Sequence, residues 1–403
     1  MATSRIGIWL VGARGGVATT SMVGLTALQH GWIGTEGLVS ELPQFAALPF
    51  VPWRDLVIGG HDVRTVSTWD AALALCRVSR ALDEQLVERA RPALLEIDRR
   101  VRQGTLWNVG STIAQLADDD ARSRDETPGT AVARLQADMA AFVQQEELRQ
   151  LIVVNVASTE PPLDVAGLPA RWSELAPLLE RPDCPLPASS LYAIAALDAG
   201  YPYINFTPSV GAAPAAIQQL ALQRGTCHMG CDGKTGETLL KSVLAPMFAQ
   251  RHLHVMSWVG HNIFGNLDGK VLEDPLNKAS KVISKDRLLS QIFGYTPQTL
   301  VSIEYIESLG DWKTAWDHVH FRGFLGTPMT LQFTWQGCDS LLAAPLLLDL
   351  VRFTELAQRR GARGLLTFLA SFFKSPLGVT ENDFCRQFQL LETWARSVGP
   401  QSP

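Results

Sequence analysis

The chain has 403 residues, of which 46% are hydrophobic and 19% charged, so it should fold as a globular protein of about two to three domains. A formal net charge of −5 argues against a general binder of nucleic acid or of anionic membranes. The sequence contains no apolar run of the roughly 18 residues that span a bilayer and no signal-peptide pattern, and its six cysteines are scattered; we expect a cytoplasmic protein.

A glycine-rich turn follows the first apolar run. Residues 5–11 (RIGIWLV) are typical of a buried parallel strand, and a helical pattern begins after the turn. A strand, a glycine turn and a helix in this order bring backbone N–H groups and the helix N-terminus to a pyrophosphate. The spacing G-x-x-G-G-x-A is irregular for such a motif, and the alternative is a plain strand-to-helix turn. We predict that the turn binds a dinucleotide through Gly12, Arg14, Gly15, Gly16, Val17 and Ala18.

Asp62 ends the next strand-like segment. Residues 56–58 (LVI) are strand-like, and GGHD follows them. An acid at the carboxyl end of a strand is well placed to bind a ribose hydroxyl, so Asp62 is our candidate for this contact. The alternative for Asp62 is an ordinary helix cap.

Helical patterns over residues 81–104, with a kink expected at Pro92, and over residues 129–148 precede a buried strand at 151–154. Two serines at 189–190 are expected to cap another helix, and a strand with a polar exit is expected at 203–208. Alternating strands and helices predict a Rossmann-like, doubly wound parallel sheet. The run of small residues that follows the strand at 151–154, with Ala157, Ser158 and Thr159, should line a cofactor cleft.

The pattern changes near residue 236, where a helix (236–249) leads into alternating strands at 252–259 and within 313–335. These predict a second sheet with one polar face. Two histidine pairs, at 252/254 and 318/320, fit a polar face better than a metal site. A long apolar helix is expected at 339–356, and another from about 365 to 371.

Lysine is distributed unevenly. The chain has eight lysines, none of them in residues 1–233, and six fall within residues 231–285. Arginine keeps its proton in proteins, whereas the pKa of lysine falls readily on burial or beside another cation. The cluster therefore indicates acid–base chemistry or binding of phosphate or an oxyanion, with a basic surface patch as the alternative.

Six ordered motifs resemble the inositol-3-phosphate synthase family in its shorter archaeal and bacterial form. They are DGKTGETLLKSVLAPMF, GHNIFGNLDGKVL, NKASKVISKD, DWKTAWDHVHFRGFLG, DSLLAAPLLLDLVRF and FFKSP, and the similarity extends upstream through GGHD and NVASTE. The resemblance covers most of the chain. It implies a redox-neutral conversion of D-glucose 6-phosphate to 1D-myo-inositol 3-phosphate: NAD oxidises C5, C6 enolises and attacks the C1 aldehyde, and NADH then reduces C5.

The resemblance also implies roles for individual residues. Lys281 and Lys374 would act at the C5 oxygen, Lys313 would polarise the C1 carbonyl, and Lys285 would hold phosphate or the C5 oxyanion. Asp232 would join the catalytic set and Asp339 the cofactor site. Asn205, Thr207, Ser209, Asn262 and Asp268 would contact the substrate. The lysines at 234, 241, 270 and 278 are expected to matter less.

The implied architecture is an NAD-binding domain of residues 1–238 and 343–403, with residues 239–342 as a catalytic domain that also builds a homotetramer. A divalent metal ion is left open, with Asp232 or Asp268 as candidate ligands. Arg14 in the glycine turn, His61 in place of a usual tryptophan and His261 in place of a usual tyrosine depart from the family pattern. His61 and His261 leave room for a changed substrate, whereas Arg14 would rearrange the pyrophosphate contact or reach a phosphate itself.

Three alternatives remain at this point. The first is a related cyclase for another sugar phosphate, such as fructose 6-phosphate. The second is an ordinary NAD dehydrogenase with net turnover of the cofactor. The third, from a different class, is a non-catalytic NAD-binding sensor or scaffold, against which the presence of all four matched lysines argues.

Overall fold

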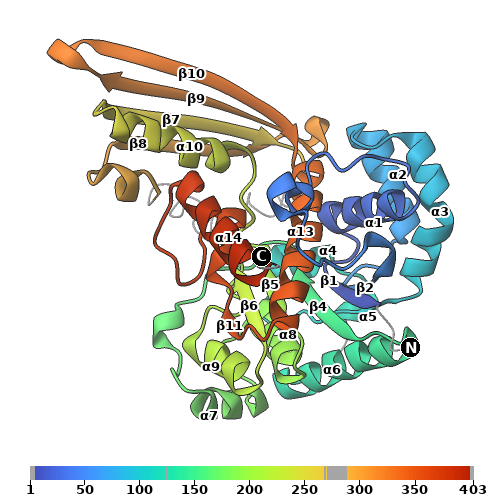
Figure 1. Ribbon diagram of the computed structural model, residues 1–403. Helices are drawn as coiled ribbons and strands as arrows, with labels where there is room; N and C mark the ends of the chain where they lie inside the picture. Colours follow the sequence, from blue (N-terminus) through green and yellow to red (C-terminus); the bar gives the residue numbers. More distant parts are fainter. Residues whose placement is uncertain (1–4, 124, 267–268, 270–287, 400–403) are drawn as a thin grey trace.

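A computed structural model describes residues 5–123, 125–266, 269 and 288–399 (Figure 1). Seven parallel strands form one sheet in the order β11-β6-β5-β4-β1-β2-β3. The order reverses between β1 and β4, which is the switch point of a doubly wound fold. The predicted fold class is confirmed. The strand bounds are β1 Ile6–Val11, β2 Leu56–Asp62, β3 Val101–Gln103, β4 Gln150–Asn155, β5 Tyr203–Asn205, β6 Cys227–Gly230 and β11 Gly364–Leu365.

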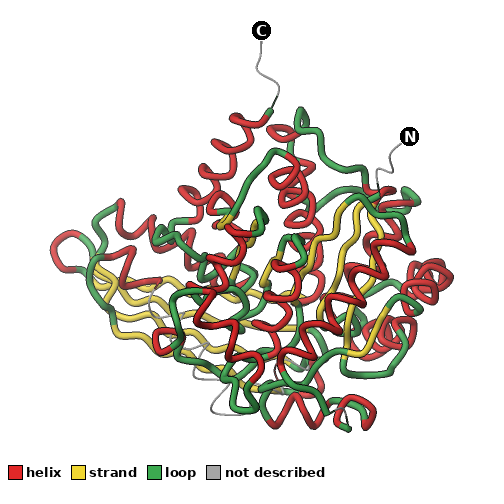
Figure 2. Tube along the Cα trace, turned by 90° about the horizontal axis from the view of Figure 1, so that it is seen from below, coloured by secondary structure: helices red, strands yellow, loops and turns green. Residues whose placement is uncertain are grey.

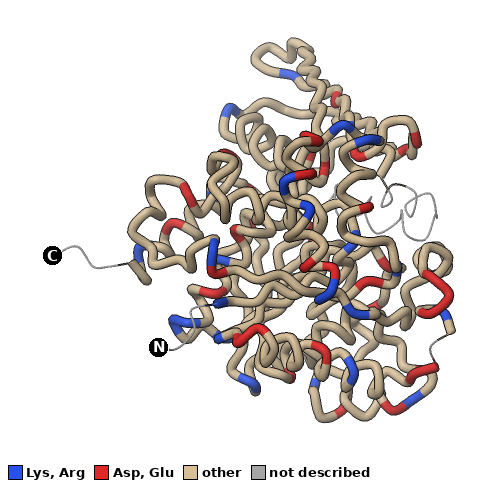
Figure 3. Tube along the Cα trace, turned by 90° about the vertical axis from the view of Figure 1, so that its right-hand side faces the viewer, with Lys and Arg blue, Asp and Glu red and all other residues tan. Residues whose placement is uncertain are grey.

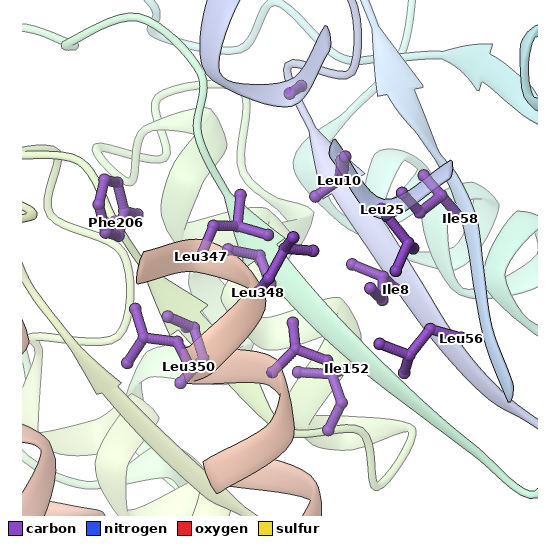
Figure 4. Close-up of a cluster of buried hydrophobic side chains, with 14 of the residues drawn as sticks. Ile8, Leu10, Leu25, Leu56, Ile58, Ile152, Phe206, Leu347, Leu348 and Leu350 are labelled. Carbon is purple, nitrogen blue, oxygen red and sulfur yellow. The ribbon is translucent and has the colours of Figure 1, made fainter. Parts of the chain in front are cut away.

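Helices cover both faces of this sheet. On one face, apolar strand residues such as Ile8 and Ile152 pack against Leu347 and Leu348 of α13 (Figure 4). On the other face, strand residues including Trp9 pack against α6, α8 and α9. Burial on both faces explains why these strands are nearly continuous apolar runs. The helices of the first face are α1 Gly16–Gln29, α2 Thr68–Ser79, α3 Glu84–Asp98, α13 Asp339–Arg359 and α14 Phe384–Val398, and those of the second are α6 Pro128–Gln145, α8 Ala188–Asp198 and α9 Ala215–Gln223.

A second, four-stranded sheet extends to one side of the first (Figures 1 and 2). Its order is β10-β9-β7-β8, with β7 and β8 parallel and the other pairs antiparallel. Helix α10 covers one face, where Phe248 packs on Trp258 and Val319. The elements are α10 Gly236–Gln250, β7 His254–Phe264, β8 Gln298–Tyr305, β9 Trp312–Arg322 and β10 Pro328–Cys338.

Shorter helices connect these elements. The α-helices are α4 Ser111–Leu116, α5 Asp119–Arg122 and α7 Trp172–Leu175. The 3-10 helices are Val39–Glu41, Pro43–Phe45, Trp53–Asp55, Val165–Gly167, Ala176–Glu180, Glu307–Leu309, Phe324–Gly326 and Thr367–Phe372.

Four local predictions were wrong. The helix expected over residues 81–104 spans only Glu84–Asp98, and Val101–Gln103 form the edge strand β3 instead. The helix expected from about 365 to 371 is the short strand β11 followed by a 3-10 helix, Thr367–Phe372. The strand expected from 252 begins at His254, because His252 has a φ of +53° and lies outside the extended region. Helix α8 is preceded by Pro187 and has no side-chain cap, since the serines at 189–190 lie in its first turn.

The two sheets come from separate parts of the sequence. The four-stranded sheet uses residues 254–338, and the seven-stranded sheet uses residues before 231 and after 363. The domain limits at 238 and 343 stay a prediction. Within the described residues no helix is long and apolar enough to cross a membrane. Lys and Arg are interspersed with Asp and Glu on the side of the molecule shown in Figure 3.

Candidate active site

A cavity of about 610 Å³ opens where the carboxyl ends of β1, β2 and β4 meet the first turn of α13. This is the crevice at the switch point, where doubly wound proteins bind dinucleotides. Ala18 is the predicted cofactor residue that does not line the cavity; it lies in α1 with its side chain buried in the core. The predicted cofactor residues that line it are Gly12, Arg14, Gly15, Gly16, Val17, Asp62, Ala157, Ser158, Thr159 and Asp339.

The glycine turn fits a pyrophosphate. Gly12 has a φ of +85°, and a Cβ atom there would lie 2.7 Å from the Cα of Ala157. The N–H groups of Gly12 and Ala13 both donate to the carbonyl of His61, at 2.9 and 3.0 Å, which fixes the turn against β2. Helix α1 begins after Gly15 without a side-chain cap. Its first backbone N–H groups are therefore oriented for an anion.

Asp232 and Lys374 meet across a short backbone ladder. The N–H of Lys374 donates to the carbonyl of Asp232 at 2.7 Å, and Gly233 pairs with Phe373 in an antiparallel bridge. The Lys374 ammonium donates to the Asp232 carboxylate at 2.9 Å, and both residues line the cavity. Residues 142 positions apart thus form an ion pair beside the dinucleotide crevice.

Lys313 lies at the start of β9 with its Nζ atom 4.0 Å from a carboxylate oxygen of Asp339 and 5.3 Å from the centre of the Phe264 ring. Asp339 lines the cavity, whereas Lys313 is not among the lining residues. Asp339 therefore lies between the cavity and the ammonium of Lys313.

Asp311 is a site residue that the sequence interpretation missed. Its carboxylate accepts hydrogen bonds from the backbone N–H and the hydroxyl of Ser340, at 2.9 and 3.0 Å, and from the Cys338 thiol. Asp311, directly before β9, thus caps α13 and holds the turn that carries Asp339. Burial raises the pKa of Asp311. The feature of the sequence that could have identified Asp311 is its position in the DWK motif, two residues before Lys313.

Two lysines that were expected to matter less are fully buried. Burial lowers the pKa of Lys234 to about 7, and its ammonium donates to Gln387 of α14. Lys241 pairs with Glu237 at 2.6 Å beneath the second sheet. Replacing either would disturb the folded state, so neither is suited as a control for an activity measurement.

A buried polar network supports the cavity floor. The side-chain amide of Asn155 donates to the Asn205 side chain at 3.1 Å and to the Thr207 hydroxyl at 3.3 Å. Asn205 donates to the carbonyl of Ser209, whose hydroxyl accepts the N–H of Glu160 at 3.0 Å. Among the predicted substrate residues, Thr207 lines the cavity, and Asn205 and Ser209 lie beneath it.

Glu160, also missed from the sequence, gives a prediction about stability. Burial raises the pKa of its carboxyl to about 7, although the Ser189 N–H donates to it at 2.8 Å and the Ser189 hydroxyl also bonds it. Between pH 4.5 and 7 the folded state then binds more protons than the unfolded state, so the free energy of unfolding falls as pH rises. At roughly 1.4 kcal/mol per pKa unit, the loss is about 3 kcal/mol.

Glu160→Gln mimics the protonated carboxyl, and we expect it to remove this loss. Urea denaturation at pH 4.5 and pH 8 should show the variant gaining about 3 kcal/mol over the parent protein between the two values. Parallel pH dependences of the two proteins would contradict the argument.

The remaining predicted residues lie elsewhere. Asn262 is buried in β7 and donates to the Ser302 carbonyl at 3.4 Å, away from the cavity lining. Lys281, Lys285 and Asp268 lie outside the described residues. Within the described chain no three His, Cys, Asp or Glu side chains form a cluster that could hold a metal ion.

The His61 side chain is fully buried and has a hydrogen-bond partner at each ring nitrogen. It is fully buried in β2, where its Nδ1 accepts the Trp9 indole N–H at 2.8 Å and its Nε2 lies 3.1 Å from Asp138. Since Nδ1 accepts, Nε2 carries the proton and donates to the carboxylate. The ring therefore supports the strand beneath Asp62.

Comparisons with known proteins identify the family. Residues 6–396 match a family model described as myo-inositol-1-phosphate synthase, an NAD-binding family. The chain is 29% identical to inositol-3-phosphate synthase 1 of Bacteroides thetaiotaomicron, over 100% of this chain and 97% of that protein. The crystal structure of inositol-3-phosphate synthase from Caenorhabditis elegans has a similar fold, with a TM-score of 0.88 at 24% identity over 98% of this chain and 86% of that one.

A second solved structure covers nearly the whole of both chains. It is a myo-inositol-1-phosphate synthase-related protein from Thermotoga maritima, with a TM-score of 0.79 at 25% identity over 97% of this chain and 98% of that one. The family resemblance that the motifs indicated is confirmed, and with it the prediction of an NAD site. The chain belongs to the myo-inositol-1-phosphate synthase family.

Proposed function

We propose that this protein is an NAD-dependent inositol-3-phosphate synthase, which converts D-glucose 6-phosphate to 1D-myo-inositol 3-phosphate without net oxidation. The observation that carries the proposal is the Lys374–Asp232 ion pair at the dinucleotide crevice. Oxidation at C5, enolisation at C6 and closure of the C6–C1 bond all place charge on substrate oxygens. A lysine held by a carboxylate can give and take a proton there.

The bound nicotinamide supplies reversible hydride transfer at C5. We assign Lys374 to the C5 oxygen, where Asp232 orients its ammonium by accepting a hydrogen bond from it. Lys281 shares this role by resemblance, Lys285 holds the phosphate or the C5 oxyanion, and Lys313 polarises the C1 carbonyl. Asp339, 4.0 Å from Lys313, positions that ammonium from the N-terminal turn of α13.

The test is to incubate the purified protein with glucose 6-phosphate and NAD, and to follow the product by phosphorus NMR and NADH by absorbance. Inositol phosphate without net NADH is the expected result. Net NADH would indicate an ordinary dehydrogenase instead. Silence with glucose 6-phosphate but a product from fructose 6-phosphate would indicate the related cyclase, and silence with every hexose phosphate would favour the non-catalytic NAD-binding protein.

We also propose a cytoplasmic homotetramer built through the second sheet. The face of that sheet opposite α10 exposes apolar side chains such as Leu300 and Trp316, and Phe324 at the tip of β9–β10 is 89% exposed. Apolar surface of this kind is typical of subunit interfaces. Light scattering that gave the mass of a monomer would contradict the tetramer.

The cytoplasmic part of the proposal is supported by the cysteines. All six are unpaired, which fits a reducing compartment.

A further inference from the structure

We propose that the buried carboxyl of Glu160, in the wall of the cavity, responds to the charge of the bound nicotinamide: binding of NAD⁺ releases its proton to solvent, whereas binding of NADH does not. This role goes beyond the proposed reaction and rests only on the NAD site. It makes Glu160 the residue that sets which redox form of the cofactor the protein binds more tightly.

Glu160 lies on the side of the crevice that faces the nicotinamide half of the cofactor. In a doubly wound sheet the dinucleotide crosses the switch point, with its adenosine half beside β2 and its other half beside β4 and β5. Glu160 follows β4, and it lines the cavity together with Ser189 at the start of α8. Thr207, which follows β5, also lines it. We therefore expect the charge of the nicotinamide ring to act on the Glu160 carboxyl.

The Glu160 side chain is fixed in the cavity wall. It is 6% exposed, and its carboxylate accepts the N–H of Ser189 at 2.8 Å and the Ser189 hydroxyl. The Ser189 hydroxyl accepts the N–H of Gly211 at 3.1 Å, and the N–H of Glu160 donates to the Ser209 hydroxyl at 3.0 Å. These bonds join the segments after β4 and β5 to α8, so they hold the carboxyl in place beside the cavity.

No cation pairs with this carboxyl within the part of the chain that the structure describes. The hydrogen-bonding groups that act on it, Ser189 and Ser209, are neutral. The titratable group that faces it is the phenol of Tyr203, which donates to the Ser189 carbonyl at 3.0 Å and whose own pKa burial and Glu160 raise. Burial thus outweighs the hydrogen bonds and raises the pKa of Glu160 to about 7. A buried carboxyl without a counter-ion responds strongly to a charge that is placed beside it.

The sign of the effect follows from the charge of the ring. The positive ring of NAD⁺ stabilises the carboxylate and lowers the pKa of Glu160, whereas the neutral ring of NADH does not. The affinity for NAD⁺ should therefore rise with pH, up to the pKa of about 7 that Glu160 has in the free protein. Above this pH the carboxylate favours NAD⁺, which is the form that the proposed reaction needs at its start.

The experiment titrates the protein with NAD⁺ and with NADH, without sugar phosphate, by calorimetry in buffers of different ionisation enthalpy, which counts the protons released. For a tenfold weaker proton affinity of Glu160, the parent protein should release roughly 0.4 proton per NAD⁺ near pH 7 and about none per NADH. Its preference for NAD⁺ over NADH should rise about tenfold between about pH 5 and about pH 9.

Two variants assign the proton. Glu160→Gln should remove both the proton release and the pH dependence of the preference. Asp349→Asn is the matched control, because burial also raises the pKa of Asp349, to about 6, but Asp349 does not line the cavity. This variant should keep both effects.

Equal proton release with NAD⁺ and NADH in the parent protein would overturn the proposed role and leave Glu160 as a structural cap of α8. A release that persists in Glu160→Gln, or that Asp349→Asn abolishes, would overturn it as well. If Glu160→Gln fails to fold, the comparison of the two cofactor forms on the parent protein decides alone. Because no sugar phosphate is present, a protein that shows this coupling but forms no inositol phosphate would contradict the proposed function and leave the role of Glu160 standing.

Discussion

Lys374→Ala is expected to lower turnover of the sugar phosphate by at least about 1000-fold while NAD binding changes by less than about twofold. The ammonium of Lys374 lies within hydrogen-bond distance of Asp232 at the crevice, and alanine removes it without removing the backbone hydrogen bond between the two residues. The ladder should therefore survive the substitution. Steady-state turnover and calorimetric titration with NAD⁺ provide the two readouts.

Two controls separate chemistry from charge. Lys374→Arg keeps a cation that cannot release its proton, so it should stay almost inactive if proton transfer is the role. Lys278→Ala, at a position that the sequence pattern places outside the catalytic set, should retain most activity. Equal losses in Lys278→Ala and Lys374→Ala would mean that the lysines form a general electrostatic patch.

Most of the fold could be predicted because its signals are local. Residues 6–11 and 150–155 are buried on both faces of the sheet, and burial on both faces produces a continuous apolar run in the sequence. Gly12 follows such a run directly, so the strand, turn and helix were all visible within twenty residues. The prediction failed at residues 367–372, where a buried 3-10 helix packs under α14 and no local pattern distinguishes it from an α-helix.

The missed site residues depend on contacts between distant segments. Asp311 is important because Ser340 and Cys338, about thirty residues away, donate to it. Lys234 is buried because Gln387 of α14 covers it. Neither contact produces a pattern in the sequence next to Asp311 or Lys234 from which it could be predicted. The Lys374–Asp232 pair could be anticipated only through the family resemblance, since 142 residues separate its members.

Gly12→Ala is expected to weaken NAD binding by more than about 100-fold and to destabilise the protein by about 2–4 kcal/mol. Its φ of +85° disfavours any side chain, and the added Cβ would lie 2.7 Å and 2.9 Å from the Cα and N atoms of Ala157. Those are backbone atoms at the exit of β4 and cannot move aside alone. The turn and the β4 exit, which both line the cavity, must therefore separate.

Gly31→Ala is the matched control for this prediction. Gly31 follows the C-terminus of α1 with a φ of +65°, but an added Cβ would meet no atom within 4 Å. It should cost about 1 kcal/mol of unfolding free energy and leave NAD affinity unchanged. Thermal unfolding and calorimetric titration of both variants give the comparison. If both lost NAD affinity equally, the loss in Gly12→Ala would reflect general destabilisation of the protein and not the close approach to Ala157.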